Sequence, residues 1–229
     1  MSMIRSKFIY NNLSKSEGQS GRLYLCPDGN GVPSVTTVLD KTKSEETREA
    51  LRQWRNRVGQ QTAQQITTEA AGRGTSMHKF IERWLAGEDI SVPGSNLVHQ
   101  QAHKMANLVI DGLIKPNITE VWGSEINLYF PKLYAGTTDC AGLWQGEPAI
   151  IDFKQTNKPK KREWIEDYFL QLAAYAQAHD ELYGTKIKKG VILMCSKDLE
   201  LQHWVLEGDD FDEHAYKWWD RLEQYYTHR

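Results

Sequence analysis

The chain has few cysteines and no long apolar segment, and each of these absences excludes a class of protein. Its three cysteines, Cys26, Cys140 and Cys195, lie far apart and form no CxxC pair, which argues against a zinc ribbon, an iron–sulfur cluster or a secreted disulfide framework. We therefore expect a reducing compartment. No apolar run approaches the roughly 18 residues that a membrane span needs. Residues 1–15 also lack the apolar block of a signal peptide, so no membrane partner is expected.

Neither sign of charge is in excess, so the composition gives no general electrostatic reason to expect a nucleic-acid partner. Lysine and arginine number 28 and aspartate and glutamate 30, which leaves a net charge of -2. Any basic surface must then be local. Residues 48–57 and 158–162 are basic stretches, although a solvated face is the commoner explanation for such runs. With 40% hydrophobic residues among 229, residues 1–229 are expected to fold as one domain.

The N-terminal part, residues 22–115, is predicted to contain a hairpin followed by helices. Residues 22–39 alternate around the sequence PDGNG at residues 27–31, which is strong turn chemistry between two short apolar segments. Ser44 followed by two glutamates is typical of a capped helix start. The glycines of residues 72–74 are expected to interrupt the helix that begins there. The predicted helices cover residues 44–71, 75–87 and 97–115.

The second part, residues 118–229, has the pattern of a sheet-containing catalytic core. Alternating apolar residues and turn signals predict three antiparallel strands, a long helix over residues 164–183, two further strands and a final helix. A helical connection of this length is typical of a crossover between strands. We therefore predict an α/β fold with a mixed central sheet flanked by helices. The predicted strands cover residues 126–130, 134–144, 149–155, 190–195 and 201–206, and the last helix covers residues 210–226.

The second and third predicted strands form a hairpin whose two faces differ in chemistry. Pairing of Trp144 with Ala149 across the turn places Asp139 opposite Lys154, and directly opposite residues share a face of the sheet. This face then carries Asp139, Ala141, Asp152 and Lys154. The other face carries Cys140, Gly142, Trp144, Ala149, Ile151 and Phe153. Because side chains alternate along a strand, the second set predicts core packing.

Two carboxylates on neighbouring strands of a half-buried sheet need a positive charge nearby. Their repulsion and lost hydration cost on the order of several kcal/mol for each buried ion. Lys154 supplies one positive charge, and a divalent cation would supply two. Oxygen ligands without a nearby cysteine suit a hard ion such as Mg²⁺ or Mn²⁺. For an isolated D-x-K pattern, a structural ion pair between strands is the simpler explanation.

Four short motifs follow one another along the chain. They are G-T-x-x-H at residues 74–78, G-x-x-D at 136–139, D-x-K at 152–154 and Q-x-x-x-Y at 171–175. Each motif alone is a weak signal, but four in this order resemble the RecB-type branch of the PD-(D/E)xK nuclease superfamily. The resemblance implies the restriction-endonuclease-like core of that superfamily, preceded here by an N-terminal hairpin and helical region.

Two further segments narrow the resemblance within that branch. Residues 33–39, PSVTTVL, and residues 151–159, IDFKQTNKP, are similar to segments of mitochondrial genome maintenance exonucleases and similar phage-encoded exonucleases. The match covers residues 22 to about 180. Gln155 stands where a threonine or serine is usual, which puts a local hydrogen bond in doubt but not the metal ligands. The missing cysteines exclude the iron–sulfur members of the branch.

The resemblance implies a metal-dependent hydrolase that cuts phosphodiester bonds. Its metal ligands would be His78, Asp139, Asp152 and the backbone carbonyl of Phe153. Lys154 would orient the attacking water and stabilise charge in the transition state, and no covalent intermediate is expected. Glu125 is a further candidate for an acidic ligand or base, although an ordinary exposed glutamate explains it equally well. A helical histidine outside such a motif is more often a core or surface residue that forms ordinary hydrogen bonds and binds no metal.

Several groups of residues are candidates for contact with nucleic acid. Gln171 and Tyr175 can donate hydrogen bonds to the scissile phosphate or its neighbour without competing for the metal; a surface pair on the helix is the alternative. Trp54 among arginines and the Trp84 region offer stacking surface and charge, which favours single strands, whereas Trp218 is expected to pack structurally. Hydroxyl residues near the hairpin could equally stabilise their strand. The predicted DNA contacts are Ser34, Thr36, Thr37, Arg52, Trp54, Arg55, Arg73, Thr75, Gln171 and Tyr175.

The predicted function is a metal-dependent exonuclease that hydrolyses phosphodiester bonds of single-stranded DNA, or of DNA with single-stranded ends, in DNA replication, repair or recombination. Replication or recombination proteins would be its protein partners. A structure-specific flap endonuclease on the same fold and a non-catalytic nucleic-acid-binding subunit are the alternatives. The expected location is the cytoplasm of a bacterium or of a phage-infected host cell, because the predicted structure begins too early for a full mitochondrial transit peptide.

Overall fold

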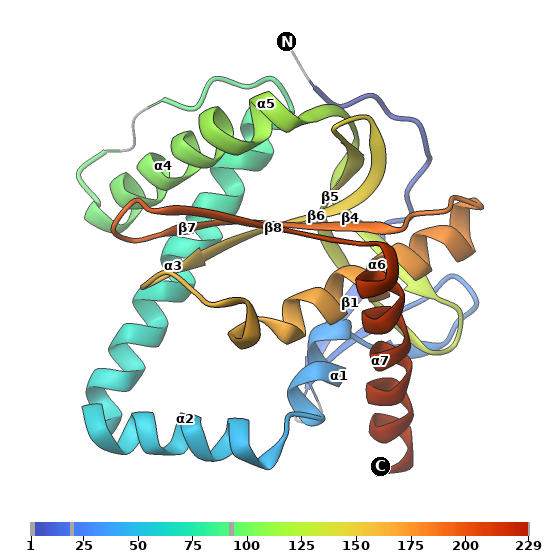
Figure 1. Ribbon diagram of the computed structural model, residues 1–229, viewed down its shortest axis with the longest axis horizontal. Helices are drawn as coiled ribbons and strands as arrows, with labels where there is room; N and C mark the ends of the chain where they lie inside the picture. The colour runs from blue at the N-terminus through green and yellow to red at the C-terminus, as the bar shows by residue number, and fades with distance from the viewer. Residues whose placement is uncertain (1–2, 19–20, 92–93, 229) are drawn as a thin grey trace.

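A five-stranded mixed sheet lies at the centre of the protein (Figure 1), whose computed structural model describes residues 3–18, 21–91 and 94–228. The strand order is β4-β5-β6-β7-β8. Strands β6 and β7 are parallel, and the other neighbouring pairs are antiparallel. The predicted α/β fold with a mixed, helix-flanked sheet is therefore confirmed. The strands are β4 (Ile118–Phe130), β5 (Tyr134–Trp144), β6 (Glu147–Thr156), β7 (Lys189–Ser196) and β8 (Leu201–Glu207).

The β5–β6 hairpin turns more tightly than the sequence pattern predicts. Gln145 and Gly146 form a two-residue turn with φ angles of 51° and 88°, the left-handed conformation that matches the twist of a hairpin. Trp144 consequently pairs with Glu147, and the predicted pairing of Trp144 with Ala149 is wrong by two residues. A slip of two residues leaves every side chain on its original face, because side chains alternate with a period of two.

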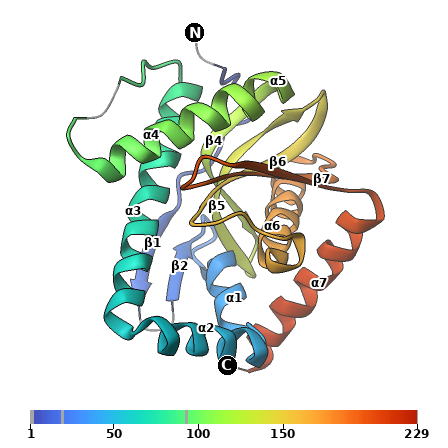
Figure 2. The ribbon, with the colours of Figure 1, turned by 60° about the vertical axis from the view of Figure 1, so that its left-hand side comes forward.

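Helices cover both faces of the sheet, as Figures 1 and 2 show. The helices α6 (Glu166–Tyr183), α7 (Gly208–Thr227) and α1 (Val35–Lys41) contribute to one hydrophobic cluster, and α4 (Leu97–Val109) and the end of α3 (Gln60–Leu85) contribute to another. Ile150 of β6 lies in the first cluster and Ile151 in the second. Neighbouring residues of a strand point to opposite faces, so this central strand is buried on both sides.

The third predicted helix is longer than expected at its C-terminal end. It begins at Leu97 as α4, with the Asn96 side chain accepting a hydrogen bond from the backbone N–H of His99 at 3.1 Å. The chain then continues without a stop through a π-helical turn, η1 (Ile110–Ile114), and the short helix α5 (Lys115–Asn117). The predicted helix ends at residue 115, whereas Pro116 lies in the first turn of α5, a position at which proline is tolerated.

The N-terminal sheet contains the predicted hairpin, but only part of the predicted segment is extended. It consists of β1 (Ser14–Gly18), β2 (Gly21–Leu25) and β3 (Gly31–Pro33), paired in that order. The expectation that residues 35–39 continue the hairpin is wrong, because they form α1. The Ser34 side chain caps this helix by accepting a hydrogen bond from the Thr37 N–H at 3.0 Å, as an N-cap serine does.

The break between the first two long helices lies at Gly59 rather than at residues 72–74. The helix α2 (Glu45–Val58) begins after Ser44, which caps it as predicted, with the Thr47 N–H donating to its side chain at 3.3 Å. Gly59 has a φ of 87°, a conformation that few other residues adopt. The predicted interruption at residues 72–74 is therefore wrong, since α3 runs through both of these glycines.

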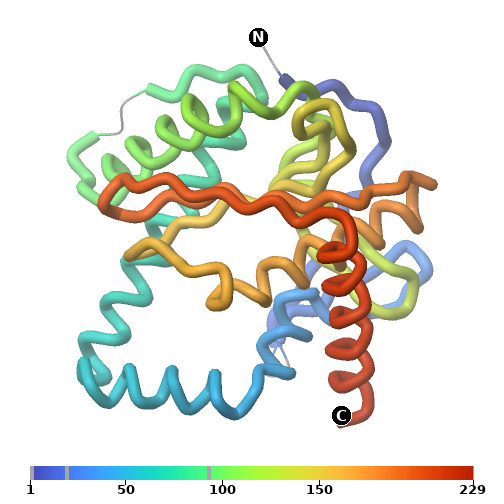
Figure 3. The backbone as a smooth tube through the Cα atoms, in the orientation of Figure 1, coloured from blue at the N-terminus to red at the C-terminus, as the bar shows by residue number. Residues whose placement is uncertain are grey.

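A projecting arm, formed by α2 and residues 60–72 of α3, extends away from the sheet. Figures 1 and 3 show α2 at the far end of the molecule from α4. No residue of α2 is buried, and Ala63 is the only buried residue of the remaining arm. The arm is therefore a solvent-exposed helical extension. Among the described residues, no helix is both long and apolar enough to cross a membrane.

Candidate active site

The residues of the four sequence motifs converge between α3, α6 and the middle of the sheet. Asp139 lies on β5, and Asp152 and Lys154 lie on β6, on the face that α6 covers. The helix α3 contributes His78 from the side, and α6 contributes Gln171 and Tyr175. Cys140, Ile151 and Phe153, on the opposite face, are buried against α3 and α4. The β5–β6 hairpin therefore has the polar face and the core face that the sequence predicts.

His78 lies against two carboxylates. Its Nδ1 atom is 3.4 Å from Asp139 Oδ1 and 3.9 Å from Glu125 Oε1. Ligand atoms of the three residues all lie within 4.8 Å of one another, a spacing that one metal ion can bridge. Burial works to lower the pKa of His78, but the two carboxylates outweigh it and raise the pKa to about 10. A cation is therefore strongly favoured at this point.

Glu125 reaches the cluster because of an unusual backbone conformation. Its φ is 53°, in the left-handed region that costs a residue with a side chain about 1–2 kcal/mol. The residue lies within β4, where an extended conformation would be normal. A strained residue at a cluster of charged groups is a recurrent feature of functional sites. From the sequence, a ligand or base and an ordinary exposed glutamate explain Glu125 equally well. The fold brings its carboxylate to His78.

The two aspartates are held differently. Asp139 Oδ2 accepts a hydrogen bond from the backbone N–H of Phe153 at 2.7 Å, which leaves Oδ1 facing His78. Asp152 is 2% exposed, and its Oδ2 lies 2.6 Å from Lys154 Nζ. This ion pair lacks the angles of a hydrogen bond, and within the described residues Asp152 Oδ2 receives none. A buried carboxylate oxygen without a hydrogen bond keeps its capacity to accept one or to bind a cation.

The protonation of the aspartate pair follows from this arrangement. Burial and the neighbouring charge of Asp139 raise the pKa of Asp152 to about 6, against the opposing effect of Lys154. Burial also works to raise the pKa of Asp139, but His78 and Lys154 outweigh it and lower that pKa. A group of carboxylate and imidazole donors without sulfur fits a hard divalent cation such as Mg²⁺ or Mn²⁺. The chain therefore contains a group of residues able to hold a divalent metal.

Lys154 is directed by α6 as well as by Asp152. Its Nζ atom lies 4.8 Å from the centre of the Tyr168 ring and 3.5 Å from Gln171 Oε1. Burial works to lower the pKa of Lys154, but the two aspartates raise it overall, so the amine is held as a cation. Tyr168 was not among the predicted site residues. Its position three residues before Gln171 on the same helical face is a signal that could have identified it.

Gln171 and Tyr175 form a pair on the buried face of α6. The Gln171 amide donates to Tyr175 Oη at 3.5 Å, and both side chains are buried, so the alternative of a surface pair does not apply. Gly136 is required beside them, because a Cβ atom there would lie 2.6 Å from Tyr175 Oη. The glycine of the G-x-x-D motif therefore provides space for the tyrosine of the Q-x-x-x-Y motif.

A cavity leads from the surface to the metal-ligating group. It has a volume of about 410 Å³ and is lined by Gly74, Thr75, His78, Lys79, Glu82 and Glu125. Thr75, a predicted DNA contact, is exposed at this opening. Gly74 lies beneath it, where a Cβ atom would be 3.2 Å from Gln155 Cγ. The glycine and threonine of the G-T-x-x-H motif thus lie at the mouth of the site, one helical turn from His78.

The predicted contacts near the N-terminal hairpin have structural partners instead. Ser34 is buried and caps α1, and Thr37 is buried with its hydroxyl accepting a hydrogen bond from the backbone N–H of Arg22 at 2.9 Å. Of the three hydroxyl residues, Thr36 alone is exposed. Ser34 and Thr37 therefore stabilise local structure, which is the alternative that the sequence left open. The element that Ser34 stabilises is a helix, not the predicted strand.

Arg73 lies below the site rather than at a free surface. It is 7% exposed. Its guanidinium donates to Gln155 Oε1 at 2.9 Å and to the side chain of Asn157. Gln155, which stands where the similar exonucleases are expected to have a threonine or serine, therefore has a hydrogen-bond partner on α3. These bonds tie the end of β6 to α3 and so position Lys154 relative to His78.

Basic and aromatic residues of the arm are mostly exposed. Arg55 is exposed, and Arg52 is exposed while paired with Glu49. Trp54 is half-buried. Trp84, on the sheet side of α3, packs against the second hydrophobic cluster, which makes it a packing residue. Trp218 is fully buried, so its predicted structural role is confirmed.

Trp164 is an exposed aromatic residue that the sequence did not single out. It lies in η2 (Arg162–Trp164), is 60% exposed, and has Lys161 Nζ 5.4 Å from its ring centre. It lines a cavity of about 630 Å³ between α2 and the start of α6. Its only sequence signal is its place two residues after the basic stretch of residues 158–162.

The fold and the site together define an α/β protein with a carboxylate–histidine group able to hold a divalent metal. No protein-family model matches the chain. It is 28% identical to mitochondrial genome maintenance exonuclease 1 of Mus musculus over 222 residues, which are 92% of this chain and 63% of that protein. The protein of the same name from Homo sapiens is 27% identical over 209 residues, or 86% of this chain and 58% of that protein.

These relatives confirm the resemblance to mitochondrial genome maintenance exonucleases that the motifs indicate. The chain spans about three fifths of the length of the relatives it matches. The crystal structure of a candidate exonuclease from Eubacterium rectale is also similar, with a TM-score of 0.49 and 15% sequence identity, over 68% of this chain and 64% of that one.

Proposed function

We propose that this protein is a metal-dependent exonuclease that hydrolyses phosphodiester bonds of single-stranded DNA. The observation that carries the proposal is the meeting of His78, Asp139, Asp152 and Lys154 at one point between α3 and the sheet. The names of the similar mouse and human proteins support an exonuclease activity. A role in DNA replication, repair or recombination, together with proteins of those processes, follows from the same proposal.

Each residue of the site has a chemical task in this proposal. His78, Asp139 and Asp152 would hold Mg²⁺ or Mn²⁺, with the Phe153 carbonyl and Glu125 as further oxygen donors. When bound, the ion supplies positive charge that stabilises the phosphodiester in its transition state. His78 and Glu125 line the cavity that opens to solvent, so the scissile phosphate can approach the site from that side.

Lys154 and α6 act on the opposite side of the same point. The Lys154 ammonium, held by Asp152 and the Tyr168 ring, orients the attacking water and balances negative charge on the phosphate. Gln171 and Tyr175 donate hydrogen bonds to a phosphate oxygen, because an amide and a phenol bind phosphate without competing for the metal. Arg73 acts indirectly, since its bonds hold the end of β6 in place.

Preference for single strands is supported by the surface around the arm. Arg55 is exposed on α2. Trp164, whose ring centre lies 5.4 Å from Lys161 Nζ, is exposed at the cavity that α2 and the start of α6 form. Exposed aromatic rings beside cationic side chains are a sequence-tolerant surface for unstacked bases. The arm and the sheet core would act as one unit on the same strand, in keeping with a single domain over residues 1–229.

Digestion of end-labelled linear and closed circular single-stranded DNA tests the proposal directly. Each substrate is incubated with Mg²⁺, with Mn²⁺ and with chelator, beside the Asp152→Asn variant as a control for contaminating nuclease. We expect the linear strand to be degraded with either metal and the circle to be spared. Cutting of the circle would indicate a structure-specific endonuclease instead. No cutting of either substrate, with DNA binding retained, would indicate a nucleic-acid-binding subunit.

A further inference from the structure

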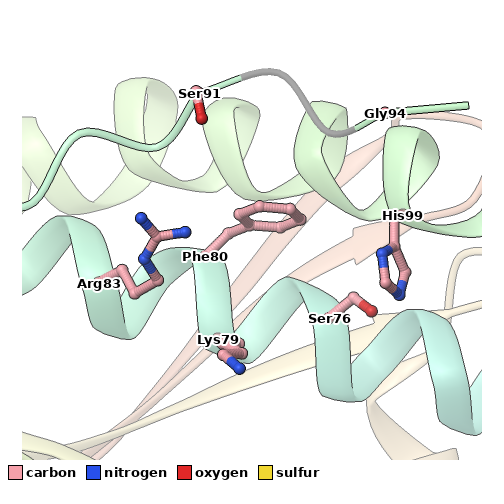
Figure 4. A pocket seen from close by; sticks show the side chains of 7 residues that line it. All are labelled: Ser76, Lys79, Phe80, Arg83, Ser91, Gly94 and His99. Atoms are coloured by element: carbon pink, nitrogen blue, oxygen red, sulfur yellow. The ribbon is translucent and has the colours of Figure 1, made fainter. Parts of the chain in front are cut away.

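A second cavity lies beside the opening of the metal site, between α3, the start of α4 and the residues Ser91 and Gly94 (Figure 4). Its volume is about 450 Å³. The side chains that line it come from Ser76, Lys79, Phe80, Arg83, Ser91 and His99. None of the mechanistic steps above uses these residues.

The spacing of residues on α3 explains why the two cavities are neighbours. Ser76, Lys79, Phe80 and Arg83 follow the i, i+3, i+4, i+7 pattern of one helical face. Thr75, His78 and Glu82 line the first cavity from the adjacent face. Lys79 lines both cavities. A ligand long enough to reach past Lys79 would therefore contact the metal site and the second cavity together.

The second cavity is basic, in contrast to the first. Lys79, Arg83 and His99 line it, and no aspartate or glutamate is among its described lining residues. Arg83 is partly neutralised, because its Nε donates to Glu88 Oε2 at 2.7 Å. Lys79 is exposed and has no ion-pair partner among the residues that the structure describes.

The remaining groups of the cavity suit an anion of modest size. Ser76 and Ser91 add hydroxyl donors. Phe80 forms an apolar wall that is fixed by edge-to-face contact with the ring of His103, at 5.1 Å between centroids. A phosphate group accepts hydrogen bonds from both ammonium and hydroxyl groups, and charge-assisted bonds of this kind are the stronger class.

We propose that this cavity is a phosphate-binding subsite, in which Lys79 holds a phosphate group of the same nucleic-acid strand next to the phosphate in the metal site. The proposal rests on the proposed function, because that function supplies a strand bearing several phosphates. It adds a second point of attachment on α3, which would set how far the strand extends past His78.

Binding without cleavage tests this subsite apart from catalysis. Fluorescence anisotropy is measured in chelator with an internally labelled single-stranded oligonucleotide that carries a 5′-phosphate, a 3′-phosphate or hydroxyls at both ends. Lys79→Gln is compared with Lys79→Arg and with Lys104→Gln, a matched control because Lys104 is an exposed lysine of α4 that lines neither cavity. Because all of these side chains are exposed, unchanged circular dichroism is expected for each variant.

We expect Lys79→Gln to weaken binding about 3–10-fold and to reduce the slope of log K against log salt by about 0.7, the value for one phosphate contact on a single strand. Lys79→Arg should retain most of the affinity, and Lys104→Gln should match the wild type. If the loss is confined to one phosphorylated end, the subsite holds a terminal phosphate. If the loss is equal for all three oligonucleotides, it holds an internal phosphodiester.

Equal effects of Lys79→Gln and Lys104→Gln on affinity and on salt dependence would overturn the proposal. That result would leave the proposed nuclease activity untouched, because binding is measured with the metal removed. Conversely, a protein that binds these oligonucleotides through Lys79 but degrades no DNA would retain the subsite and refute the nuclease. The two failures are therefore distinguishable, because binding is measured in chelator and cleavage in a separate assay with metal.

Discussion

The two halves of α3 belong to one helix but have opposite surroundings. In residues 73–85, buried side chains recur at every fourth position: Arg73, Met77, Ile81 and Leu85. In residues 60–72, Ala63 is the only buried residue. The second half packs on the sheet and presents His78 to Asp139, whereas the first half continues into the projecting arm.

The two halves of α3 differ in how firmly packing fixes the positions of their side chains. Burial of an aliphatic side chain stabilises a fold by about 1.5–3 kcal/mol, so Met77 and Ile81 hold His78 firmly against the sheet. Metal ligands require positions fixed to a fraction of an ångström, whereas contacts with a flexible strand do not. The arm, without a core of its own, is suited to the second task. The predictions below separate the two regions, beginning with the largest effect.

Neutralising the buried aspartate of the sheet side should remove activity without unfolding the protein. Asp152→Asn is expected to lower kcat/KM by at least about 10³-fold, since it removes a proposed metal ligand and its charge, and Lys154→Ala should do the same. Because burial already raises the pKa of Asp152 to about 6, the uncharged asparagine should be tolerated. Thermal unfolding and a single-strand digestion assay measure the two quantities.

A matched change in the arm is the control. Glu69→Gln removes an exposed acidic side chain of α3 and should leave kcat/KM within about 2-fold of the wild type, as is usual for exposed positions away from special features. Activity near wild type in both Asp152→Asn and Lys154→Ala would refute the assignment of the site.

Truncation of apolar side chains should have unequal effects on stability in the two regions. Ile81→Ala, at a fully buried position, is expected to lower the free energy of unfolding by about 2–5 kcal/mol. Leu51→Ala in the arm, where the side chain is 41% exposed, should lower it by less than about 1 kcal/mol. Denaturant titration gives both values. Similar losses would mean that the arm has packing partners in solution.

Lowering the pH should reduce the free energy of unfolding, because it protonates the buried His179. This histidine is buried in α6 between Tyr10 and Thr185, and burial lowers its pKa from 6.5 to about 4. The unfolded chain therefore binds a proton between these values and the folded protein does not, so the stability contribution is complete above pH 6.5 and is lost as the pH falls toward 4. From pH 7 to pH 5 this amounts to about 2 kcal/mol.

Variants isolate the contribution of His179 from other titrating groups. Unfolding free energies of the wild type and of His179→Gln are compared at pH 7 and pH 5. We expect the variant to lose about 2 kcal/mol less than the wild type over this interval. His203→Gln, at an exposed position on β8, should behave like the wild type. An identical pH dependence in all three proteins would contradict the prediction.

Two glycine substitutions should give small effects of opposite sign. Gly136→Ala is expected to destabilise the protein by about 1–3 kcal/mol, because the new Cβ would lie 2.6 Å from Tyr175 Oη. Gly72→Ala should stabilise it by about 0.4–1 kcal/mol, since the position is helical and no described atom outside the surrounding helix backbone lies within 4 Å of the new methyl group. A destabilising Gly72→Ala would mean that α3 does break at this glycine.

Local pattern was sufficient for the sheet and for the shared face of the hairpin. The alternation in residues 134–144 and the turn glycine placed Asp139 and Asp152 on the same side, even though the predicted pairing was two residues off. The reason is the period of two along a strand, which makes a slip of two harmless to the choice of face. Helix breaks were less predictable, because Gly59, Gly72 and Gly74 are chemically identical and only their packing differs.

Other members of the candidate site depend on distances that local pattern does not contain. Glu125 reaches His78 through one left-handed residue in an otherwise extended strand. Tyr168 has only a weak sequence signal, and its contact with Lys154 exists only in the fold, as does the cavity that Trp164 lines between α2 and the start of α6. Arg73 resembles a surface cation in the sequence, but it is buried against Gln155.

The sequence by itself determined the strands of the central sheet, the alternation of β5 and β6, and the residue types that can hold a metal beside Lys154. These follow from short-range rules, because helix and strand periodicity and side-chain chemistry depend on near neighbours along the chain. Tertiary structure alone decided that His78 meets Asp139 and Glu125, and that the two halves of α3 have different surroundings. Those outcomes depend on burial and on contacts between residues far apart in the chain, which exist only once α3 packs against the sheet.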